Sequence, residues 1–245
     1  MKKYKICAII PARSGSKTVK DKNIIKVLGH PLLAYSISIA KKSNLIDKVI
    51  FTSDSNKYLR IASKYKPDIL HKRSKKNSSD KSTDLDFLKE IMNFLNKNEN
   101  YNPDLIVLLR GNCATRNLKN LNKAIRDFTK NFKKYSSLRS VTKMSETSYK
   151  TFIIQSNKLK SIISGNFNTE NANKPKEMFP ETYSGDGYLD IIKSKLIKKN
   201  KLHGSNVMPF FHDDICVDID YPHDLAYTKF VLKYYKYFKP NNVSK

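Results

Sequence analysis

The sequence predicts an α/β fold, a three-layer arrangement in which helices cover both faces of a central sheet. Two observations support this prediction. Short aliphatic runs alternate with amphipathic segments, most of them of ten or more residues, and loops rich in polar donors follow the aliphatic runs. Strands that are separated by helices of this length are joined by crossovers, which favours parallel pairing. The chain has 245 residues, enough for one domain with a full core, so we expect a single domain over residues 1–245.

The first half of the chain is predicted to form successive strand and helix pairs. The strands are expected at Ile6–Ile10, Lys48–Asp54, Asp68–His71 and Leu105–Leu109, and the helices at Pro31–Ser43, Asn56–Tyr65, Asp84–Leu95 and Leu118–Phe132. Pro11 should end the first strand because it has no N–H to donate. Ser82 or Thr83 is placed to cap the third helix.

After about residue 136 the pattern changes to strands with few helices between them. Strand-like runs lie at Ser140–Met144, Thr151–Gln155, Gly187–Ile192, Val207–Phe211 and Ile215–Asp220. The segment Asn157–Thr182 is polar and contains Pro175 and Pro180. We therefore expect a small β excursion at about residues 140–190, which serves either as a flexible arm or as a dimer contact.

Composition restricts the class of partner and the compartment. The formal net charge is +25, and lysines are spread along the whole chain. Two interpretations stay open, an unselected basic surface or selection for an anionic ligand, whereas a nucleic-acid footprint would more often be a patch. The three cysteines, Cys7, Cys113 and Cys216, are too few and too far apart for a disulfide framework or a cysteine zinc site. With no signal peptide and no apolar span of membrane length, a soluble cytoplasmic protein is expected.

A cluster of donors follows the first predicted strand. It contains Arg13, Ser14, Gly15, Ser16, Lys17, Lys20 and Lys22. Open α/β sheets bind ligands at the carboxyl ends of their strands, so this loop fits a triphosphate. Neither GxxxxGK[ST] nor GxGxxG is present, which excludes a P-loop and a dinucleotide fingerprint. The alternative is that lysines are common here and any loop would look basic.

Two carboxylates near the carboxyl end of the chain are candidates for metal binding. Asp218 and Asp220 stand in the run VDID, and alternation along a strand would place them on one face. Carboxylates one pleat apart can ligate Mg²⁺ or Mn²⁺ through oxygen. The alternative is a pair of solvated edge residues.

Several motifs resemble those of the sugar-acid cytidylyltransferases, which make CMP-activated sialic, legionaminic, pseudaminic and KDO-type acids. IPARSGSK at residues 10–17 and DKNI at 21–24 are similar to the family signature IPARxGSKGxPxKNI, and VDIDYPHDL at 217–225 is similar to VDIDTPEDL. YSGDGYLDII at 183–192 resembles YQANGYVDII of the legionaminic and flagellar-sugar branch. The chain departs from the family at Thr18, Lys20 and Asp186, and in the loop 111–115, which lacks two prolines.

The resemblance implies a nucleotide-diphospho-sugar-transferase-like (Rossmann-like) α/β/α fold with a mixed sheet, and a homodimer made through the β excursion. It implies that CTP activates a nonulosonic sugar acid to the CMP-sugar with release of pyrophosphate. Arg13 and Lys22 would be catalytic, and Asp218 and Asp220 would hold Mg²⁺ or Mn²⁺. CTP would be bound by Ala12, Arg13, Ser14, Gly15, Ser16, Lys17, Lys22, Asn23, Arg73, Ser82, Thr83 and Asp84. The sugar acid would be bound by Arg110, Arg116, Tyr183, Asp186 and Tyr188. The alternative is a catalytically weakened homologue that binds nucleotide or sugar acid without transfer.

Overall fold

The computed structural model describes residues 4–16, 18–162, 169–235, 237, 239 and 240. The chain forms two compact units. The larger unit comprises residues 1–140 and 187–245, and the smaller is Val141–Asp186. The smaller unit falls within the stretch where the sequence predicts a β excursion.

A seven-stranded sheet forms the centre of the fold, in the order β11-β7-β10-β6-β1-β4-β5. The strands are β1 (Ile6–Pro11), β4 (Lys48–Ser53), β5 (Ile69–Lys72), β6 (Leu105–Leu108), β7 (Ser137–Lys143), β10 (Tyr183–Lys193) and β11 (Val207–Phe210). β1 pairs in parallel with β4 and β6, and β5 in parallel with β4. β10 runs antiparallel to β6, so the sheet is mixed. The predicted α/β/α fold class is confirmed.

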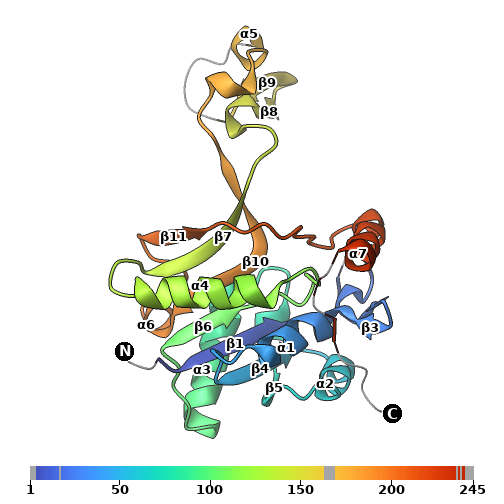
Figure 1. Ribbon diagram of the computed structural model, residues 1–245, viewed down its shortest axis with the longest axis vertical. Helices are drawn as coiled ribbons and strands as arrows, with labels where there is room; N and C mark the ends of the chain where they lie inside the picture. Colours follow the sequence, from blue (N-terminus) through green and yellow to red (C-terminus); the bar gives the residue numbers. More distant parts are fainter. Residues whose placement is uncertain (1–3, 17, 163–168, 236, 238, 241–245) are drawn as a thin grey trace. The chain divides into compact units, whose positions relative to one another are not determined.

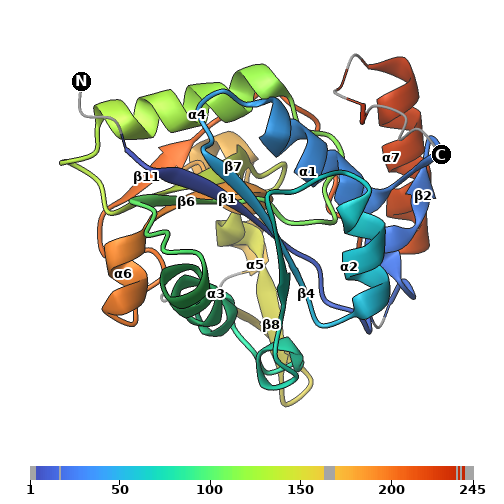
Figure 2. The same ribbon diagram turned by 90° about the horizontal axis from the view of Figure 1, so that it is seen from below.

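Helices cover both faces of this sheet (Figures 1 and 2). One face carries α1 (Leu32–Lys42), α2 (Asn56–Ser63) and α4 (Leu118–Lys130), and the other carries α3 (Asp84–Asn98) and α6 (Ser194–Lys198). Successive side chains of β1 point to opposite faces of the sheet, and so they belong to two separate hydrophobic cores. Ile6, Ala8 and Ile10 pack with α1 and α4, whereas Cys7 and Ile9 pack with α3. No helix in the described part of the chain is both long and apolar enough to cross a bilayer.

The remaining elements are two short ribbons, short helical turns and one longer helix. β2 (Lys26–Val27) and β3 (His30–Pro31) form a two-stranded ribbon, and α7 (Pro222–Tyr234) is the last helix. In the smaller unit, β8 (Phe152–Gln155) and β9 (Lys158–Ser161) form an antiparallel hairpin, followed by α5 (Thr169–Ala172). Single 3₁₀ turns occur at Lys22–Ile24, Lys76–Ser78, Ser148–Lys150 and Lys176–Met178.

One predicted strand is wrong. The segment Ile215–Asp220 is irregular, because the chain leaves the sheet after β11 and no described strand pairs with it. The alternation of burial nevertheless survives. Val217 and Ile219 are buried, and Asp218 and Asp220 are exposed. The two aspartates therefore face outward because their neighbours are anchored in the core, and not because a strand ladder holds them.

Candidate active site

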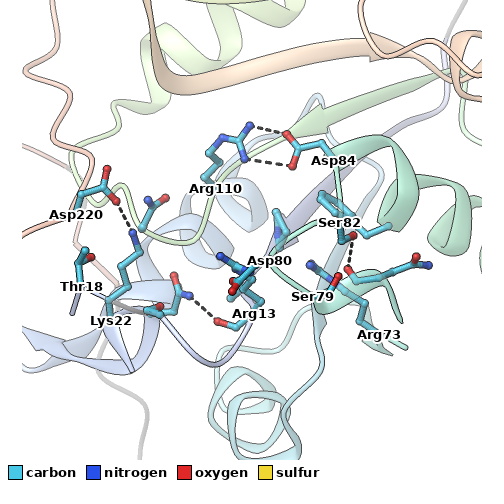
Figure 3. Close-up of a pocket in the computed structure, with 17 residues that line it drawn as sticks. Arg13, Thr18, Lys22, Arg73, Ser79, Asp80, Ser82, Asp84, Arg110 and Asp220 are labelled. Atoms are coloured by element: carbon cyan, nitrogen blue, oxygen red, sulfur yellow. Dashed lines mark hydrogen bonds and ion pairs between the residues drawn. The ribbon is translucent and has the colours of Figure 1, made fainter. Parts of the chain in front are cut away.

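A cavity of about 410 Å³ lies where loops follow the carboxyl ends of β1, β5 and β6 (Figure 3). These three strands belong to one parallel set, so their carboxyl ends reach the same edge of the sheet. The cavity is lined by ten of the residues predicted for a site, namely Ala12, Arg13, Ser16, Lys22, Asn23, Arg73, Ser82, Asp84, Arg110 and Asp220. Segments that lie up to two hundred residues apart in the sequence thus meet at one place.

Arg73 is the most deeply buried cation of the cavity wall. Only 5 % of its surface is exposed, and its guanidinium stacks 4.3 Å from the centre of the Phe87 ring. Among the described residues, no hydrogen-bond partner contacts its Nε or Nη2. Burial lowers the pKa of Arg73 to about 10. A buried cation with unpaired donors at a cavity wall is suited to an anionic ligand, which would supply the missing acceptors.

Lys22 and Asn112 hold the two aspartates that precede α7. The Nζ of Lys22 donates to Asp220 Oδ1 at 2.8 Å and to the carbonyl of Ile219 at 2.7 Å. The amide of Asn112 donates to Asp218 Oδ1. Although Asp218 keeps an exposed edge, desolvation by the surrounding protein raises its pKa, and the charge of Asp220 raises it further. Two carboxylates that disfavour each other's charge are a suitable oxygen donor set for a hard divalent cation.

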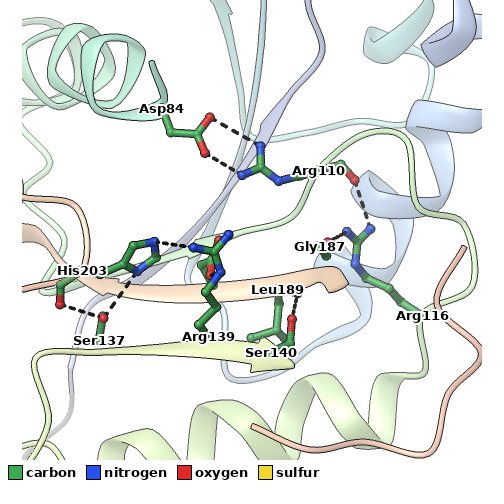
Figure 4. A network of polar contacts seen from close by, with 10 residues as sticks. Asp84, Arg110, Arg116, Ser137, Arg139, Ser140, Gly187, Leu189 and His203 are labelled. Atoms are coloured by element: carbon green, nitrogen blue, oxygen red, sulfur yellow. Dashed lines mark hydrogen bonds and ion pairs between the residues drawn. The ribbon is translucent and has the colours of Figure 1, made fainter. Parts of the chain in front are cut away.

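Arg110 reaches the cavity from the loop after β6. Its guanidinium pairs with Asp84, the first residue of α3, through Nη2–Oδ2 at 2.6 Å and Nη1–Oδ1 at 3.4 Å (Figures 3 and 4). The exposed fraction of the Arg110 side chain is 31 %. The two-pronged contact fixes the plane of the guanidinium at the cavity wall.

Three residues predicted to bind CTP shape the loops and do not line the cavity. The backbone N–H and the hydroxyl of Ser14 both donate to Asp54, at 2.8 and 2.5 Å. Gly15 adopts a φ of +77°, a left-handed turn that favours glycine. Thr83 caps α3 in a capping box with Asp86. Lys17 lies outside the described residues.

Two residues predicted to bind the sugar acid are internal. Arg116 is 1 % exposed and donates to the carbonyls of Tyr188, Cys113, Arg110 and Gly187 and to the hydroxyl of Ser36 (Figure 4). Tyr188 is fully buried, and its hydroxyl donates to Asp214. Their positions give both residues a structural part in the framework below the loop. Tyr183 and Asp186 belong to the smaller unit, and their role in sugar binding stays a prediction.

Seven further residues line the cavity without having been predicted as ligands. They are Pro11, Thr18, Asn77, Ser79, Asp80, Phe87 and Asn112. Asp80 pairs with Arg13 Nη1 at 2.7 Å across the loop before α3. The resemblance implies CTP contacts for Arg73, Ser82, Thr83 and Asp84 of the polar run 72–84, so this segment was expected at the site. Which of its many polar side chains face the cavity depends on its fold.

Glu90 of α3 anchors this polar loop from behind. Its carboxylate accepts from the Ser74 N–H at 2.7 Å and the Ser74 hydroxyl at 2.6 Å, and also from the amide of Asn77. His71 Nε2 lies 3.7 Å from the same carboxylate. Asn77 in turn lines the cavity, so Glu90, six residues beyond the predicted site residue Asp84, helps to determine how the loop is held.

The chain resembles a solved CMP-sugar-acid synthetase in fold. The solved structure titled CMP:2-keto-3-deoxy-manno-octonic acid synthetase complexed with CTP superposes with a TM-score of 0.68, covering 94 % of this chain and 98 % of that one at 14 % identity. At that identity the likeness concerns the fold alone.

Sequence comparison adds curated relatives. The chain is 35 % identical to the N-acylneuraminate cytidylyltransferase of Escherichia coli, over 59 % of this chain and 33 % of that protein. It is 27 % identical to the post-translational flagellin modification protein B of Campylobacter coli, over 93 % of this chain and 95 % of the relative. The chain thus spans about a third of the first relative and nearly all of the second, and the second agrees with the predicted flagellar-sugar branch.

A family pattern also matches the chain. The family described as Cytidylyltransferase matches residues 7–185, which include β1, the donor loop after it, the polar loop before α3 and the loop after β6. Since this match takes in most of the chain and most of the segments that meet at the cavity, the chain belongs to the cytidylyltransferase family.

Proposed function

We propose that this protein transfers the cytidylyl group of CTP to a nonulosonic, sialic-type sugar acid, giving the CMP-sugar and pyrophosphate. The observation that carries the proposal is the meeting of Arg13, Lys22, Arg73 and Arg110 at one cavity with Asp220 at its rim. A triphosphate and a sugar carboxylate are both anionic, so these cations suit them; Arg13, Lys22 and Arg110 are held by the carboxylates of Asp80, Asp220 and Asp84, and Arg73 keeps donors without a partner among the described residues.

The cations account for the chemistry that this reaction needs. The anomeric hydroxyl attacks the α-phosphorus, and negative charge grows on the phosphate oxygens and on the leaving pyrophosphate. Donors that are fixed before the reaction stabilise this charge most effectively, because they need no reorganisation. Lys22 meets that condition, since its Nζ is already held by Asp220 and the carbonyl of Ile219.

Asp218 and Asp220 fit a Mg²⁺ or Mn²⁺ ion. Both carboxylates are exposed and Asp220 lines the cavity, and magnesium sites commonly use one or two carboxylates together with substrate phosphates. When bound, the ion would neutralise phosphate charge as a Lewis acid. Lys22 and Asn112, which contact these carboxylates, would keep them oriented toward the nucleotide.

The polar loop 73–84 supports recognition of the base. Cytosine presents an amino donor beside a ring nitrogen and a carbonyl, so its site needs acceptors and donors side by side. Asn77, Ser79 and Ser82 supply both kinds of group at the cavity wall, and the Ser82 hydroxyl is oriented by donation to the Asn77 carbonyl at 2.8 Å.

A homodimer in the cytoplasm completes the proposal. In the smaller unit, Ile153, Ile154 and Leu159 are 47, 77 and 49 % exposed. Apolar side chains that gather on one hairpin favour burial against a partner, and a second copy of the chain is the partner that the family resemblance implies.

The test is pyrophosphate release by the purified protein with CTP, Mg²⁺ and a panel of sialic, legionaminic, pseudaminic and KDO-type acids, beside ATP, GTP and UTP. Release with CTP and one acid is expected. Asp220→Ala should abolish that release while it keeps the wild-type melting temperature, because Asp220 is exposed at the rim. If CTP raises the melting temperature but no acid in the panel supports release, the protein is a binding homologue and the transfer proposal fails.

A further inference from the structure

Two thiols from distant parts of the sequence touch beside the proposed site. The Sγ atoms of Cys113 and Cys216 lie 3.6 Å apart, although the residues are separated by 103 positions. Both are thiols in this structure. Cys113 is 2 % exposed, whereas Cys216 is partly accessible, so one member of the pair can be reached from solvent. Because the cysteines are far apart in the sequence, the sequence analysis predicted no disulfide framework.

The pair joins the two loops that carry the candidate site. Cys113 follows Asn112 in the loop after β6, and Cys216 stands two positions before Asp218. The Asn112 amide donates to Asp218, so this hydrogen bond and the contact between the thiols both connect the same two loops. Neither cysteine belongs to a helix or strand, so the backbone at each position can shift without breaking the hydrogen bonds of a helix or a sheet.

We propose that Cys113 and Cys216 form an oxidisable dithiol, a modification site at which a small-molecule disulfide produces an internal Cys113–Cys216 disulfide that lowers the transfer activity. The effect on activity rests on the proposed function, whereas formation of the bond does not.

The exchange balances in two steps. The more accessible Cys216 attacks one sulfur of the external disulfide, which releases one thiol and leaves a mixed disulfide on Cys216. Cys113 then attacks the Sγ of Cys216, which forms the internal bond and releases the second thiol. The two protons of the cysteines leave on the released thiols, and the two electrons reduce the external disulfide.

Geometry explains why the bond would inhibit. A disulfide holds its sulfurs about 2.05 Å apart, so the two Sγ atoms must approach by about 1.5 Å. That movement is transmitted to Asn112 and Asp218, one and two residues away. A misplacement of about 1 Å in a catalytic arrangement can cost on the order of a hundredfold in rate.

Cys7 provides an internal control. It is fully buried in β1, and the surrounding core raises the pKa of its thiol far above the usual range. It should stay reduced under conditions that oxidise the pair. Cys7→Ala should therefore leave the response to oxidant unchanged.

The experiment treats the full-length reduced protein with oxidised glutathione and follows intact mass, cross-linked peptides and pyrophosphate release before and after dithiothreitol. We expect loss of two hydrogens, a linked Cys113–Cys216 peptide, and a fall in rate of about tenfold or more that dithiothreitol reverses. Compared with its own reduced rate, Cys216→Ser should lose the response, whereas Cys113→Ser can complete only the first step and should stop at a glutathione adduct on Cys216 with no linked peptide.

Each outcome decides the proposal. A glutathione adduct that persists on Cys216, or three unmodified thiols, would overturn the dithiol site. A linked peptide with an unchanged rate would overturn its regulatory effect. If the protein shows no turnover in any state, the proposed function has failed, while the mass measurement still decides the bond and the CTP-induced shift in melting temperature replaces the rate as the readout of the site.

Discussion

Arg110 and Arg116 stand six residues apart in one loop, and the structure predicts opposite consequences of replacing them. Arg116→Met would remove five hydrogen bonds from a site that is 1 % exposed, although the Arg110 carbonyl would keep its bond from the Ser36 hydroxyl. Each lost buried hydrogen bond costs about 1 kcal/mol, and part of this loss is offset because a charge is no longer buried. We expect the free energy of unfolding to fall by about 3–5 kcal/mol.

This destabilisation should be visible as a melting temperature lowered by roughly 10 °C, at about 2–4 °C per kcal/mol for a domain of this size. Arg110→Met is the matched control. Arg110 is partly exposed and makes one ion pair, with Asp84, so its loss should cost only about 1 kcal/mol. It lines the cavity, however, and its replacement should raise the KM for the substrates strongly.

The assay combines thermal unfolding with steady-state kinetics on both variants. The expected pattern is low stability with nearly normal KM for folded Arg116→Met, and normal stability with high KM for Arg110→Met. The reasoning is refuted if Arg116→Met melts like the wild type while its KM for the sugar acid rises, because Arg116 would then be a ligand and not part of the framework.

Two further predictions concern the wall behind the polar loop. Glu90→Gln should raise the KM for CTP about tenfold with little change in kcat, because the amide keeps only one acceptor oxygen for Ser74 and Asn77. Lys89→Gln on the same helix is the control. An unchanged KM for Glu90→Gln would contradict the anchoring role. Burial holds the pKa of His71 below the ordinary value of 6.5, so as pH falls through about 6.5 the unfolded chain takes up a proton that the folded chain does not. Stability should therefore decrease below about pH 6.5, and His71→Asn should flatten that dependence in melting curves; equal slopes for both proteins would argue against it.

The elements of the sheet and its helices were predictable because local pattern and tertiary burial agree in them. The aliphatic run of β6 and the helical spacing of apolar residues in α3 leave little choice of secondary structure. Ile215–Asp220 shows the limit of this reasoning. Alternating apolar and acidic residues predict a strand, yet pairing needs a neighbour, and the segment lies beyond the edge of the sheet.

The fold class, the family and the segments that meet at the cavity could be predicted from the sequence, since these depend on periodicity and on motifs that are continuous along the chain. Which side chain of each segment reaches the cavity depends on how the loops pack, and the sequence pattern does not reveal it. Arg110 and Arg116 have the same chemistry, and the packing of the loop on β10 places one at the cavity wall and the other in the interior. The same holds for Cys113 and Cys216, because contacts between residues far apart in the sequence arise when the chain closes on itself and leave no local pattern to read.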